Sequence, residues 1–208
     1  MAEDSTLKFL APTWDAIYIQ SIKLATQLRK SDNWPFDVIV GVSRGGLAIT
    51  RIMSDLLDIQ KVMVTRCEYY SDVGERKERP VITQKIQGSI RGKNVLLIDD
   101  VSDTGESLIE IKKYLISKRP NSITVATIHI KPWSILIPDY YVSKTDAWII
   151  YPWELCEAIK SLTAKQGTPI LAKTGMPSKY VRMILEMDKS LIQLAKTDIA
   201  HVSKKVRK

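Results

Sequence analysis

Carboxylates and hydroxyls lie close together in the stretch Val95 to Ser107, which reads VLLIDDVSDTGES. An apolar run ends in Asp99 and Asp100, and Asp103 follows after two residues. A turn that enters a helix near Thr104 offers free backbone N–H groups at the positive end of the helix dipole, which suits a phosphate. Paired carboxylates suit sugar hydroxyls, or a Mg²⁺ ion that bridges to phosphate oxygens. The combination predicts a site for a phosphorylated sugar.

Two other stretches follow apolar runs and are expected at the same edge of a sheet. Gly41 to Gly46 reads GVSRGG, in which glycine allows close approach of the backbone to a ligand and Arg44 can grip a diphosphate. Ile130 to Trp133 reads IKPW. The first stretch lacks the ending of a P-loop and the spacing of a dinucleotide fingerprint, so neither ATP nor NAD is favoured. Ligands of doubly wound sheets bind at this edge.

Apolar runs rich in Val and Ile alternate with helix-period segments over the first 150 residues, which predicts a mostly parallel sheet flanked by helices. The expected helices are 13–28, 46–57 and 104–117, and the expected strands are 37–42, 61–67, 95–98, 122–130 and 147–151. Residues 68–93 hold ten charged residues and little helical periodicity, which indicates a flexible functional loop or hairpin. We expect a core over residues 1–153.

Residues 154–208 form a predicted helical appendage, with breaks at Gln166–Pro169 and Thr174–Ser178. Of the 31 Lys and Arg residues, 11 lie in residues 155–208 against 4 acidic residues, so the net charge of +8 is concentrated there. A basic tail is compatible with an anionic partner or with a solvated helical surface. Cys67 and Cys156 form no C-x-x-C pair, which argues against a zinc ribbon or redox dithiol.

The stretch VLLIDDVSDTGES resembles the signature of type I phosphoribosyltransferases. TWDAI near the N-terminus, VGVSRGGL, IKPW and DAWIIYPWE occur in the order and spacing of the purine enzymes of xanthine-guanine type. The resemblance covers residues 12–154 and does not include the tail. It implies the type I phosphoribosyltransferase α/β fold, here with a C-terminal helical bundle. It also implies a Mg²⁺-dependent transfer of phosphoribose from 5-phosphoribosyl 1-pyrophosphate (PRPP) to a purine.

By that resemblance, Asp99 and Asp100 would hold the ribose hydroxyls of PRPP directly and through Mg²⁺, and Glu154 is a candidate second metal ligand. Asp103 would be the catalytic residue that manages the proton at purine N7. The 5′-phosphate would be held by Ser102, Asp103, Thr104, Gly105, Glu106 and Ser107. The pyrophosphate would be held by Ser43, Arg44 and Gly45, the purine by Lys131, Trp148 and Ile149, and the loop would close through Tyr69 or Tyr70.

The identity of the purine is open at this stage. Lys131 is a hydrogen-bond donor and suits the 6-oxo group of hypoxanthine, guanine or xanthine, whereas the 6-amino group of adenine is itself a donor. A xanthine-guanine-like core followed by a basic helical tail, however, resembles a group of archaeal adenine enzymes. We therefore expect salvage of adenine to AMP, with the 6-oxopurines as the alternative.

The tail raises a hypothesis of another class. Thr168 to Leu185 resembles a helix-turn-helix, which would suit a DNA-binding regulator that senses PRPP or a nucleotide. Gly175 follows Ala172 by three residues where that motif usually has four, so we expect a structural bundle and no nucleic-acid partner. Relatives are usually homodimers, and we expect one here. No apolar run is long enough for a membrane span and no signal peptide is indicated, so we expect a cytoplasmic protein.

Overall fold

The computed structural model describes residues 7–70 and 79–187. It divides into two compact units, one of Asp15–Asp146 and the other of the segment up to Trp14 with the chain from Ala147 onward. The predicted boundary at residue 154 falls inside the second unit, and the division into core and appendage stays a prediction. Within the described residues, no helix is both long enough and apolar enough to cross a membrane.

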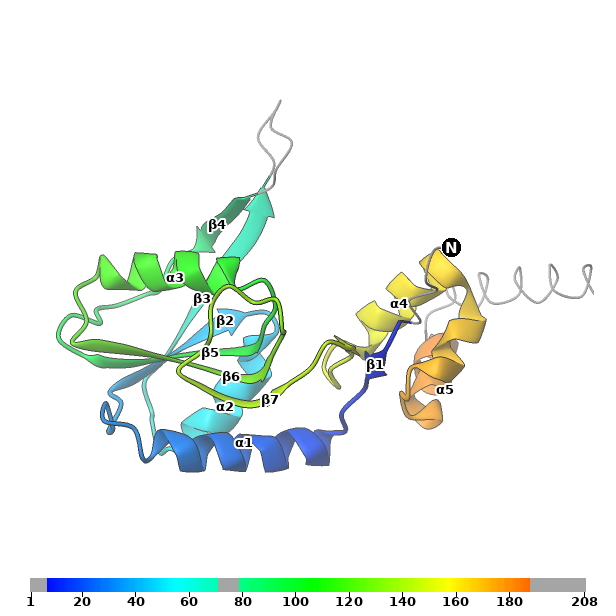
Figure 1. Ribbon diagram of the computed structural model, residues 1–208, viewed down its shortest axis with the longest axis horizontal. Coiled ribbons are helices and arrows are strands. Elements are labelled where there is room, and N and C mark those ends of the chain that lie inside the picture. Colours follow the sequence, from blue (N-terminus) through cyan, green and yellow to red (C-terminus); the bar gives the residue numbers. More distant parts are fainter. Residues whose placement is uncertain (1–6, 71–78, 188–208) are drawn as a thin grey trace, which may run out of the picture. The chain divides into compact units, whose positions relative to one another are not determined.

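A six-stranded sheet in the order β4-β3-β2-β5-β6-β7 forms the centre of the first unit, and only β4 runs antiparallel to its neighbour. Helix α3 covers one face, and α1 and α2 cover the other (Figure 1). The elements of this unit are α1 (Trp14–Leu28), β2 (Val38–Ser43), α2 (Gly46–Leu56), β3 (Val62–Tyr70), β4 (Arg79–Gln84), β5 (Asn94–Ser102), α3 (Glu106–Ile116), β6 (Ser122–Ile130) and β7 (Tyr140–Lys144).

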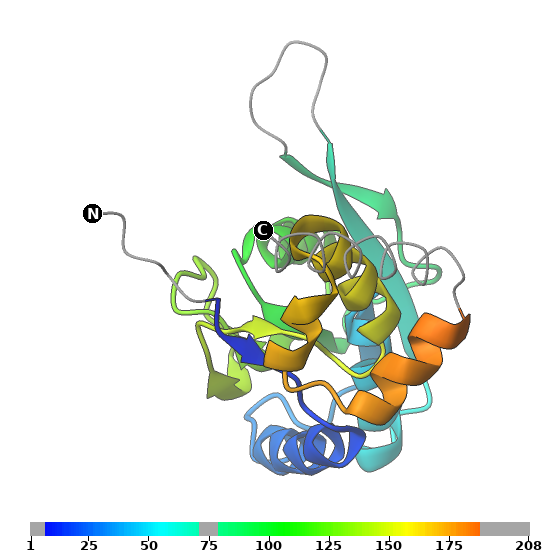
Figure 2. The same ribbon diagram turned by 90° about the vertical axis from the view of Figure 1, so that its right-hand side faces the viewer.

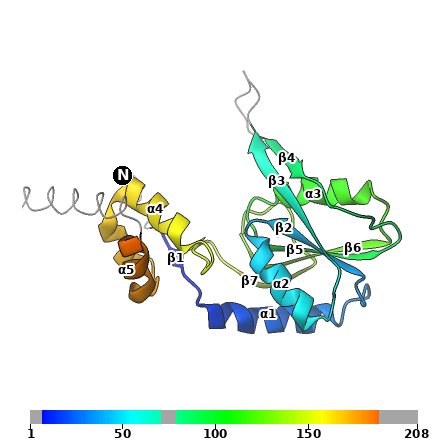
Figure 3. The same cartoon turned by 180° about the vertical axis from the view of Figure 1, so that it is seen from behind.

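Burial on both faces explains the continuous apolar runs of the central strands. Residues 95–98 of β5 are fully buried, as are residues 38–40 of β2. Side chains of alternate residues point to opposite faces. The side chains on one of these faces pack with Leu108, Ile111 and Leu115 of α3 in a single core cluster. Seen from behind, α2 crosses the other face beside β3 (Figure 3).

The structure corrects several predicted boundaries. Strand β5 continues to Ser102, four residues beyond the expected end, because β6 pairs with it as far as Ile130. The edge strand β7 was missed by the sequence prediction because it is half-exposed and lacks a long apolar run. Part of the predicted loop or hairpin over 68–93 forms the β3–β4 hairpin, paired from Arg66↔Gln84 to Tyr70↔Arg79. Its residues 71–78 lie outside the described residues.

In the described residues, the second unit contains a two-stranded parallel sheet and three helical segments, and these helical segments are yellow to orange in Figure 2. They are β1 (Phe9–Leu10), β8 (Trp148–Ile149), α4 (Leu155–Gln166), the 3₁₀ helix η1 (Thr168–Lys173) and α5 (Ser178–Met187). Gly167 and Gly175, both at positive φ, separate the helical segments at the predicted breaks. Residues of all three segments share one apolar cluster with Phe9 and Trp148. The predicted bundle extends past Met187, outside the described residues, and stays a prediction.

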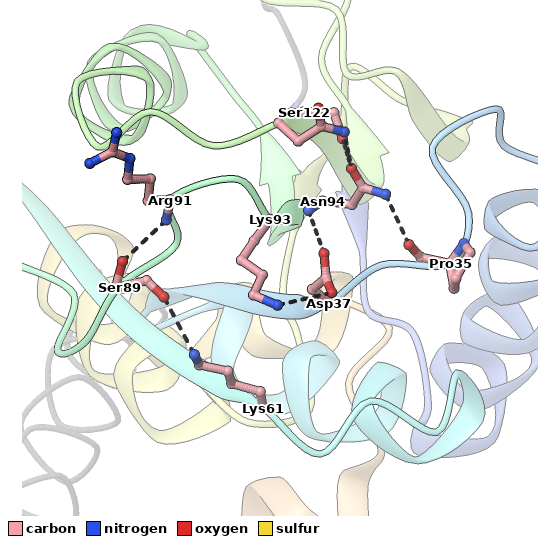
Figure 4. A network of polar contacts seen from close by, with 9 residues as sticks. Pro35, Asp37, Lys61, Ser89, Arg91, Lys93, Asn94 and Ser122 are labelled. Atoms are coloured by element: carbon pink, nitrogen blue, oxygen red, sulfur yellow. Dashed lines mark hydrogen bonds and ion pairs between the residues drawn. The ribbon is translucent and has the colours of Figure 1, made fainter.

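At the amino ends of the strands, polar side chains join the starts of β2 and β5 (Figure 4). The Asp37 carboxylate accepts the backbone N–H of Asn94 at 2.7 Å, and its other oxygen lies 3.4 Å from the Lys93 ammonium. The Asn94 side chain donates to the Pro35 carbonyl and accepts from the Ser122 hydroxyl. The backbone hydrogen bond from Asn94 lowers the pKa of Asp37, and the Lys93 ammonium acts in the same direction.

We expect Asp37→Ala to lower the free energy of unfolding by about 1 kcal/mol or less at pH 7, because the hydrogen bond is lost but the site is partly screened by solvent. A carboxyl whose pKa is lowered in the folded state stabilises the protein above its unfolded pKa of about 3.9, and loses that effect as the pH falls through the folded value. Urea unfolding of the wild-type protein and the variant between pH 3 and 7 measures this dependence of the free energy of unfolding on pH. Asp32→Ala, at an exposed aspartate, is the control. If the two variants lost the same free energy of unfolding at pH 7, the stabilising role of Asp37 would be contradicted.

Candidate active site

The two adjacent carboxylates lie where β5 extends past one of its neighbours. Pairing of β5 with β2 ends at Gly41↔Ile98, whereas pairing with β6 continues to Ser102↔Ile130. Asp99 and Asp100 therefore emerge beside the turn that follows β2. The Asp99 carboxylate accepts the backbone N–H of Asp100 at 3.0 Å and that of Gly46. The Asp100 carboxylate accepts the N–H of Val101 at 2.8 Å.

Burial raises the pKa of Asp99 well above its ordinary value, and the negative charge of Asp100 adds to this effect. A carboxylate with a raised pKa is one whose charge is poorly compensated by its surroundings. A carboxylate in this condition, with a second carboxylate beside it, favours a ligand that brings positive charge or hydroxyl donors. The chemistry matches that expected for ribose hydroxyls and a divalent cation.

The turn between β2 and α2 approaches these carboxylates so closely that its glycines are required. A Cβ atom at Gly45 would overlap the Asp100 carboxylate, and one at Gly46 would lie 2.9 Å from the Asp99 Cα. Arg44 is exposed at the tip of the turn, and the Ser43–Arg44 peptide bond is cis. Because α2 begins at Gly46, the positive end of its helix dipole also lies at this end of the cavity.

The turn between β5 and α3 has the form expected of a phosphate-binding turn. Gly105 has φ of 85°, in the left-handed region that favours glycine, and α3 begins at the next residue. The Thr104 hydroxyl accepts the N–H of Glu106 at 3.3 Å. The Tyr69 hydroxyl, from the end of β3, lies 3.2 Å from the Thr104 hydroxyl. The β3–β4 hairpin thus reaches this turn, and Tyr69 is the tyrosine that does so in the described part.

Residues of the segment after β6 form hydrogen bonds with this turn and with the end of β5. The Ser102 side chain is fully buried, and its hydroxyl lies 2.8 Å from the Ser134 hydroxyl and 3.0 Å from the Leu136 carbonyl. The backbone N–H of Ile135 donates to the Thr104 carbonyl at 2.9 Å. A Cβ atom at Gly105 would lie 2.6 Å from the Leu136 nitrogen. Ser134 and Leu136 were missed by the sequence analysis, because nothing local to residues 134–136 indicates a contact with residues 102–105.

A cavity of about 380 Å³ connects these features, and its volume suits a small phosphorylated ligand. It brings together most of the predicted PRPP residues, although Arg44 and Glu106 are not among those that line it. Cys67, Val42, Val101 and Leu108 line it without having been predicted. The complete lining is Val42, Ser43, Gly45, Cys67, Tyr69, Asp99, Asp100, Val101, Ser102, Asp103, Thr104, Gly105, Ser107 and Leu108.

Glu106 lies instead on a separate, larger groove. This groove of about 880 Å³ runs between β4 and α3 and is lined by Arg79, Pro80, Val81, Ile82, Glu106, Ile109, Glu110, Lys113, Tyr114 and Ile135. None of the three aspartates of the signature faces it. We place the chemistry in the smaller cavity, because the carboxylates and the phosphate-type turn converge there.

Lys131 is the first residue after β6, and its side chain is only 6% exposed. Its backbone N–H donates to the Ser102 carbonyl at 3.0 Å. Burial lowers the pKa of Lys131, whereas the Asp103 and Asp146 carboxylates act in the opposite direction. The neighbouring His129 is fully buried, and burial lowers its pKa to about 4, so it is neutral at pH 7. Lys131 is thus a buried cation with acidic groups nearby.

Trp133 contacts both Asp103 and Lys131. Its indole N–H donates to Asp103 Oδ1 at 2.9 Å, and the Lys131 ammonium lies 5.4 Å from the centre of its ring. The sequence analysis selected the IKPW stretch for its lysine and did not assign a role to the tryptophan. The signal was an aromatic residue two positions after Lys131, which alone does not reveal a contact with a residue 30 positions earlier.

Three predicted site residues belong to the other compact unit. The Trp148 ring lies 5.8 Å from the Phe9 ring and packs against the apolar cluster of that unit. Ile149 is buried in β8, and Glu154 Oε1 accepts the backbone N–H of Tyr151 at 3.1 Å. Their predicted contacts with the purine and a second metal stay predictions. The side chain of Tyr70 lies outside the described residues.

The donor set at the sheet edge fits Mg²⁺ only in combination with a ligand. Within residues 7–70 and 79–187, no group of three or more His, Cys, Asp and Glu side chains is arranged to hold a metal. Mg²⁺ is usually bound by one or two carboxylates together with substrate phosphates and water. Asp99 and Asp100 supply those carboxylates, and the high pKa of Asp99 is the mark of a carboxylate that a cation would stabilise.

We expect Gly45→Ala to weaken binding of Mg²⁺–PRPP at least about tenfold, or ~1.4 kcal/mol, because the new Cβ displaces the Asp100 carboxylate. The backbone at Gly45, with φ of −55°, accepts alanine without strain, so the effect arises from overlap alone. Titration calorimetry measures the affinity. Gly92→Ala is the control: φ is +68° but no atom lies near its Cβ, so stability falls and affinity does not. Unchanged PRPP affinity in Gly45→Ala would refute the close approach.

Comparisons with known proteins agree with this geometry. Residues 13–160 match the family described as phosphoribosyl transferase domain. A xanthine-guanine phosphoribosyltransferase from Cereibacter sphaeroides is 30% identical over 69% of this chain and 85% of its own length. The enzyme of the same name from Desulfotalea psychrophila is 33% identical over 68% of this chain and 84% of its own length.

A solved structure supports the same assignment. The purine phosphoribosyltransferase from Pyrococcus horikoshii is 36% identical, with a TM-score of 0.64, over 71% of this chain and 94% of that one. The family match includes the β2–α2 turn, the acidic end of β5 and the turn into α3. The chain therefore belongs to the phosphoribosyltransferase family, and its sheet has the type I α/β fold of those enzymes.

Proposed function

We propose that the protein transfers the phosphoribosyl group of PRPP to a 6-oxopurine, namely hypoxanthine, guanine or xanthine. The products are a purine nucleoside 5′-monophosphate and pyrophosphate, and Mg²⁺ accompanies PRPP. The observation that carries the choice of base is the buried Lys131 ammonium near Asp103. A buried ammonium presents only donors, and a 6-oxo group with N7 presents acceptors.

This proposal replaces the adenine preference expected from the basic tail. The 6-amino group of adenine is a donor and would face the donors of Lys131, leaving a buried polar group unpaired. The relatives from Cereibacter sphaeroides and Desulfotalea psychrophila are both named for xanthine and guanine, which supports the alternative better than adenine. The tail did not carry enough information about the base to outweigh Lys131.

In the proposed complex, PRPP occupies the cavity of about 380 Å³. The ribose hydroxyls face Asp99 and Asp100, the 5′-phosphate lies on the turn into α3, and the pyrophosphate lies on the turn into α2. The Ser102 hydroxyl is already hydrogen-bonded to Ser134 and Leu136, so we assign it to supporting the phosphate turn. Tyr69 is the tyrosine proposed to cover this site from the hairpin, because it already contacts Thr104.

The reaction forms the bond between purine N9 and C1′ of the ribose and breaks the bond between C1′ and the pyrophosphate oxygen. Positive charge develops on the ribose ring, and the carboxylates of Asp99 and Asp100 stabilise it electrostatically. Mg²⁺ bound with the pyrophosphate would neutralise the charge of the leaving group. The proton lost from the purine passes through N7 to the Asp103 carboxylate, and Lys131 holds the 6-oxo group. The roles of Trp148 and Ile149 at the base and of Glu154 at a second metal are proposed from the family resemblance alone.

The DNA-binding alternative gains no support from the second unit. The first half of the helix-turn-helix resemblance is a six-residue 3₁₀ helix, η1, rather than an α-helix. Val181, Ile184 and Leu185 of α5 pack against the apolar cluster of their own unit. These features favour the structural bundle. The homodimer expected from the resemblance stays a prediction.

Initial rates with PRPP, Mg²⁺ and each of adenine, hypoxanthine, guanine and xanthine test the proposed function. We expect kcat/KM for at least one 6-oxopurine to exceed that for adenine by about 100-fold or more, because the Lys131 donor is matched only by the oxo group. Lys131→Gln should reduce this ratio, since the amide offers an acceptor as well as donors. If the wild-type protein preferred adenine, the proposed activity on 6-oxopurines would be refuted and the expectation of adenine salvage supported.

Asp103→Asn should lower kcat by about 100-fold or more while PRPP binding changes little, because general acid–base catalysis commonly contributes that factor. Steady-state kinetics with the preferred purine give kcat, and calorimetry gives the PRPP dissociation constant. The matched variant is Asp139→Asn, at an aspartate that accepts the N–H of Val125 away from the cavity. If Asp103→Asn weakened PRPP binding as much as it slowed turnover, its role in proton transfer would be excluded.

A further inference from the structure

Trp133 is an exposed aromatic residue with a specific polar contact. It is 52% exposed, so its burial contributes little to the core, yet its indole N–H donates to Asp103 Oδ1 at 2.9 Å. The indole nitrogen is a donor only and has no acceptor capacity. The contact therefore selects one oxygen of a residue proposed to handle a proton and leaves the other oxygen, Oδ2, available to the base.

The same indole also faces the second base-site residue. The Lys131 ammonium lies over the ring, 5.4 Å from its centre, within the range of a cation–π contact. A buried ammonium gains more from such a contact than an exposed one, and Lys131 is 6% exposed. One side chain thus touches the carboxylate through its edge and the ammonium through its face.

The backbone holds Trp133 in place between these partners. The N–H of Lys131 donates to the Ser102 carbonyl, and the N–H of Ser134 donates to the Lys131 carbonyl at 3.1 Å. Pro132 fixes one backbone angle between them. The segment that carries Trp133 is therefore hydrogen-bonded to the segment that carries Asp103, so the indole and the carboxylate are kept close to one another.

We propose that Trp133 is a positioning residue for Asp103 and Lys131 in the transfer reaction. This inference rests on the proposed function. The indole N–H holds Asp103 Oδ1, so that Oδ2 points to purine N7 and accepts its proton as N9 bonds to C1′ and pyrophosphate departs. The ring face meanwhile holds Lys131 toward the 6-oxo group. Trp133 acts through these two residues and does not itself exchange a proton.

Trp133→Phe removes the N–H and keeps an aromatic face for Lys131. We expect kcat to fall about tenfold, the effect of one hydrogen bond to a charged group, while the KM for PRPP stays within about twofold. Trp34→Phe is the matched control, because Trp34 also lies under a cation, Arg29, at 5.4 Å and is remote from the cavity. That variant should keep wild-type kcat. A fall in kcat that Trp34→Phe reproduces, or none in Trp133→Phe, overturns the proposal.

A double-mutant cycle separates positioning from a general structural effect. If Trp133 acts through Asp103, adding Trp133→Phe to Asp103→Asn should reduce the residual kcat by less than twofold, although the same change costs about tenfold in the wild-type background. Independent, multiplicative effects would overturn the proposal.

A spectroscopic measurement tests the contact without depending on activity. Of the five tryptophans, Trp133 should show an indole N–H resonance that moves upfield in Asp103→Ala by more than the other four. An unmoved resonance overturns the proposal even if the enzyme is active. If instead wild-type protein transfers phosphoribose to none of the four purines, the proposed function fails, and the proposal for Trp133 fails with it for that separate reason.

Discussion

The close approach of the turn after β2 to the acidic end of β5 is the constraint on which the rest of the site depends. Two carboxylates emerge at a buried strand end, and the backbone of Gly45 and Gly46 lies against them with no room for a Cβ atom. Negative charge is thereby placed next to backbone N–H groups at the start of α2. The Gly46 N–H lowers the pKa of Asp99, but burial and the neighbouring charge of Asp100 outweigh it, so the two carboxylates favour a ligand that brings hydroxyls and a cation.

The segment after β6 also holds the residues at this edge of the sheet in place. Through Ser134 and Leu136 it supports the phosphate turn, and through Lys131 and Trp133 it faces the acidic residue of that turn. The sugar-phosphate half and the base half of the proposed reaction are thus built on one continuous hydrogen-bonded unit. A displacement of this segment would affect both halves, which explains why its residues are buried or bonded despite lying in a loop.

The sequence predicted the local parts of this site and missed the parts that depend on the fold. Asp99, Asp100 and the Thr-Gly turn could be predicted because a strand, a turn and a helix start are written in consecutive residues. The contact of Trp133 with Asp103 joins residues 30 positions apart, and the contact of Tyr69 with Thr104 joins residues 35 positions apart, so neither follows from spacing. The edge strand β7 escaped prediction because a half-exposed strand shows no continuous apolar run. The adenine preference was inferred from the tail, but a basic charge and a helical pattern do not specify which hydrogen-bonding edge of a purine a site would accept.

The network at the opposite edge of the sheet has a consequence for the active site. Asp37 and Asn94 fix the alignment in which Val38 faces Val95, and that alignment places Gly41 opposite Ile98 three residue pairs later. Neighbouring side chains of a strand point in opposite directions, so a shift of β5 by one residue would put Asp100 or Ile98 where Asp99 lies and turn each side chain to the opposite face. The strand register can therefore change only in steps of one whole residue. Insertions or deletions within β2 or β5 would abolish the site outright, and gradual variation in what the protein binds is left to the hairpin and to the loop that carries Trp133.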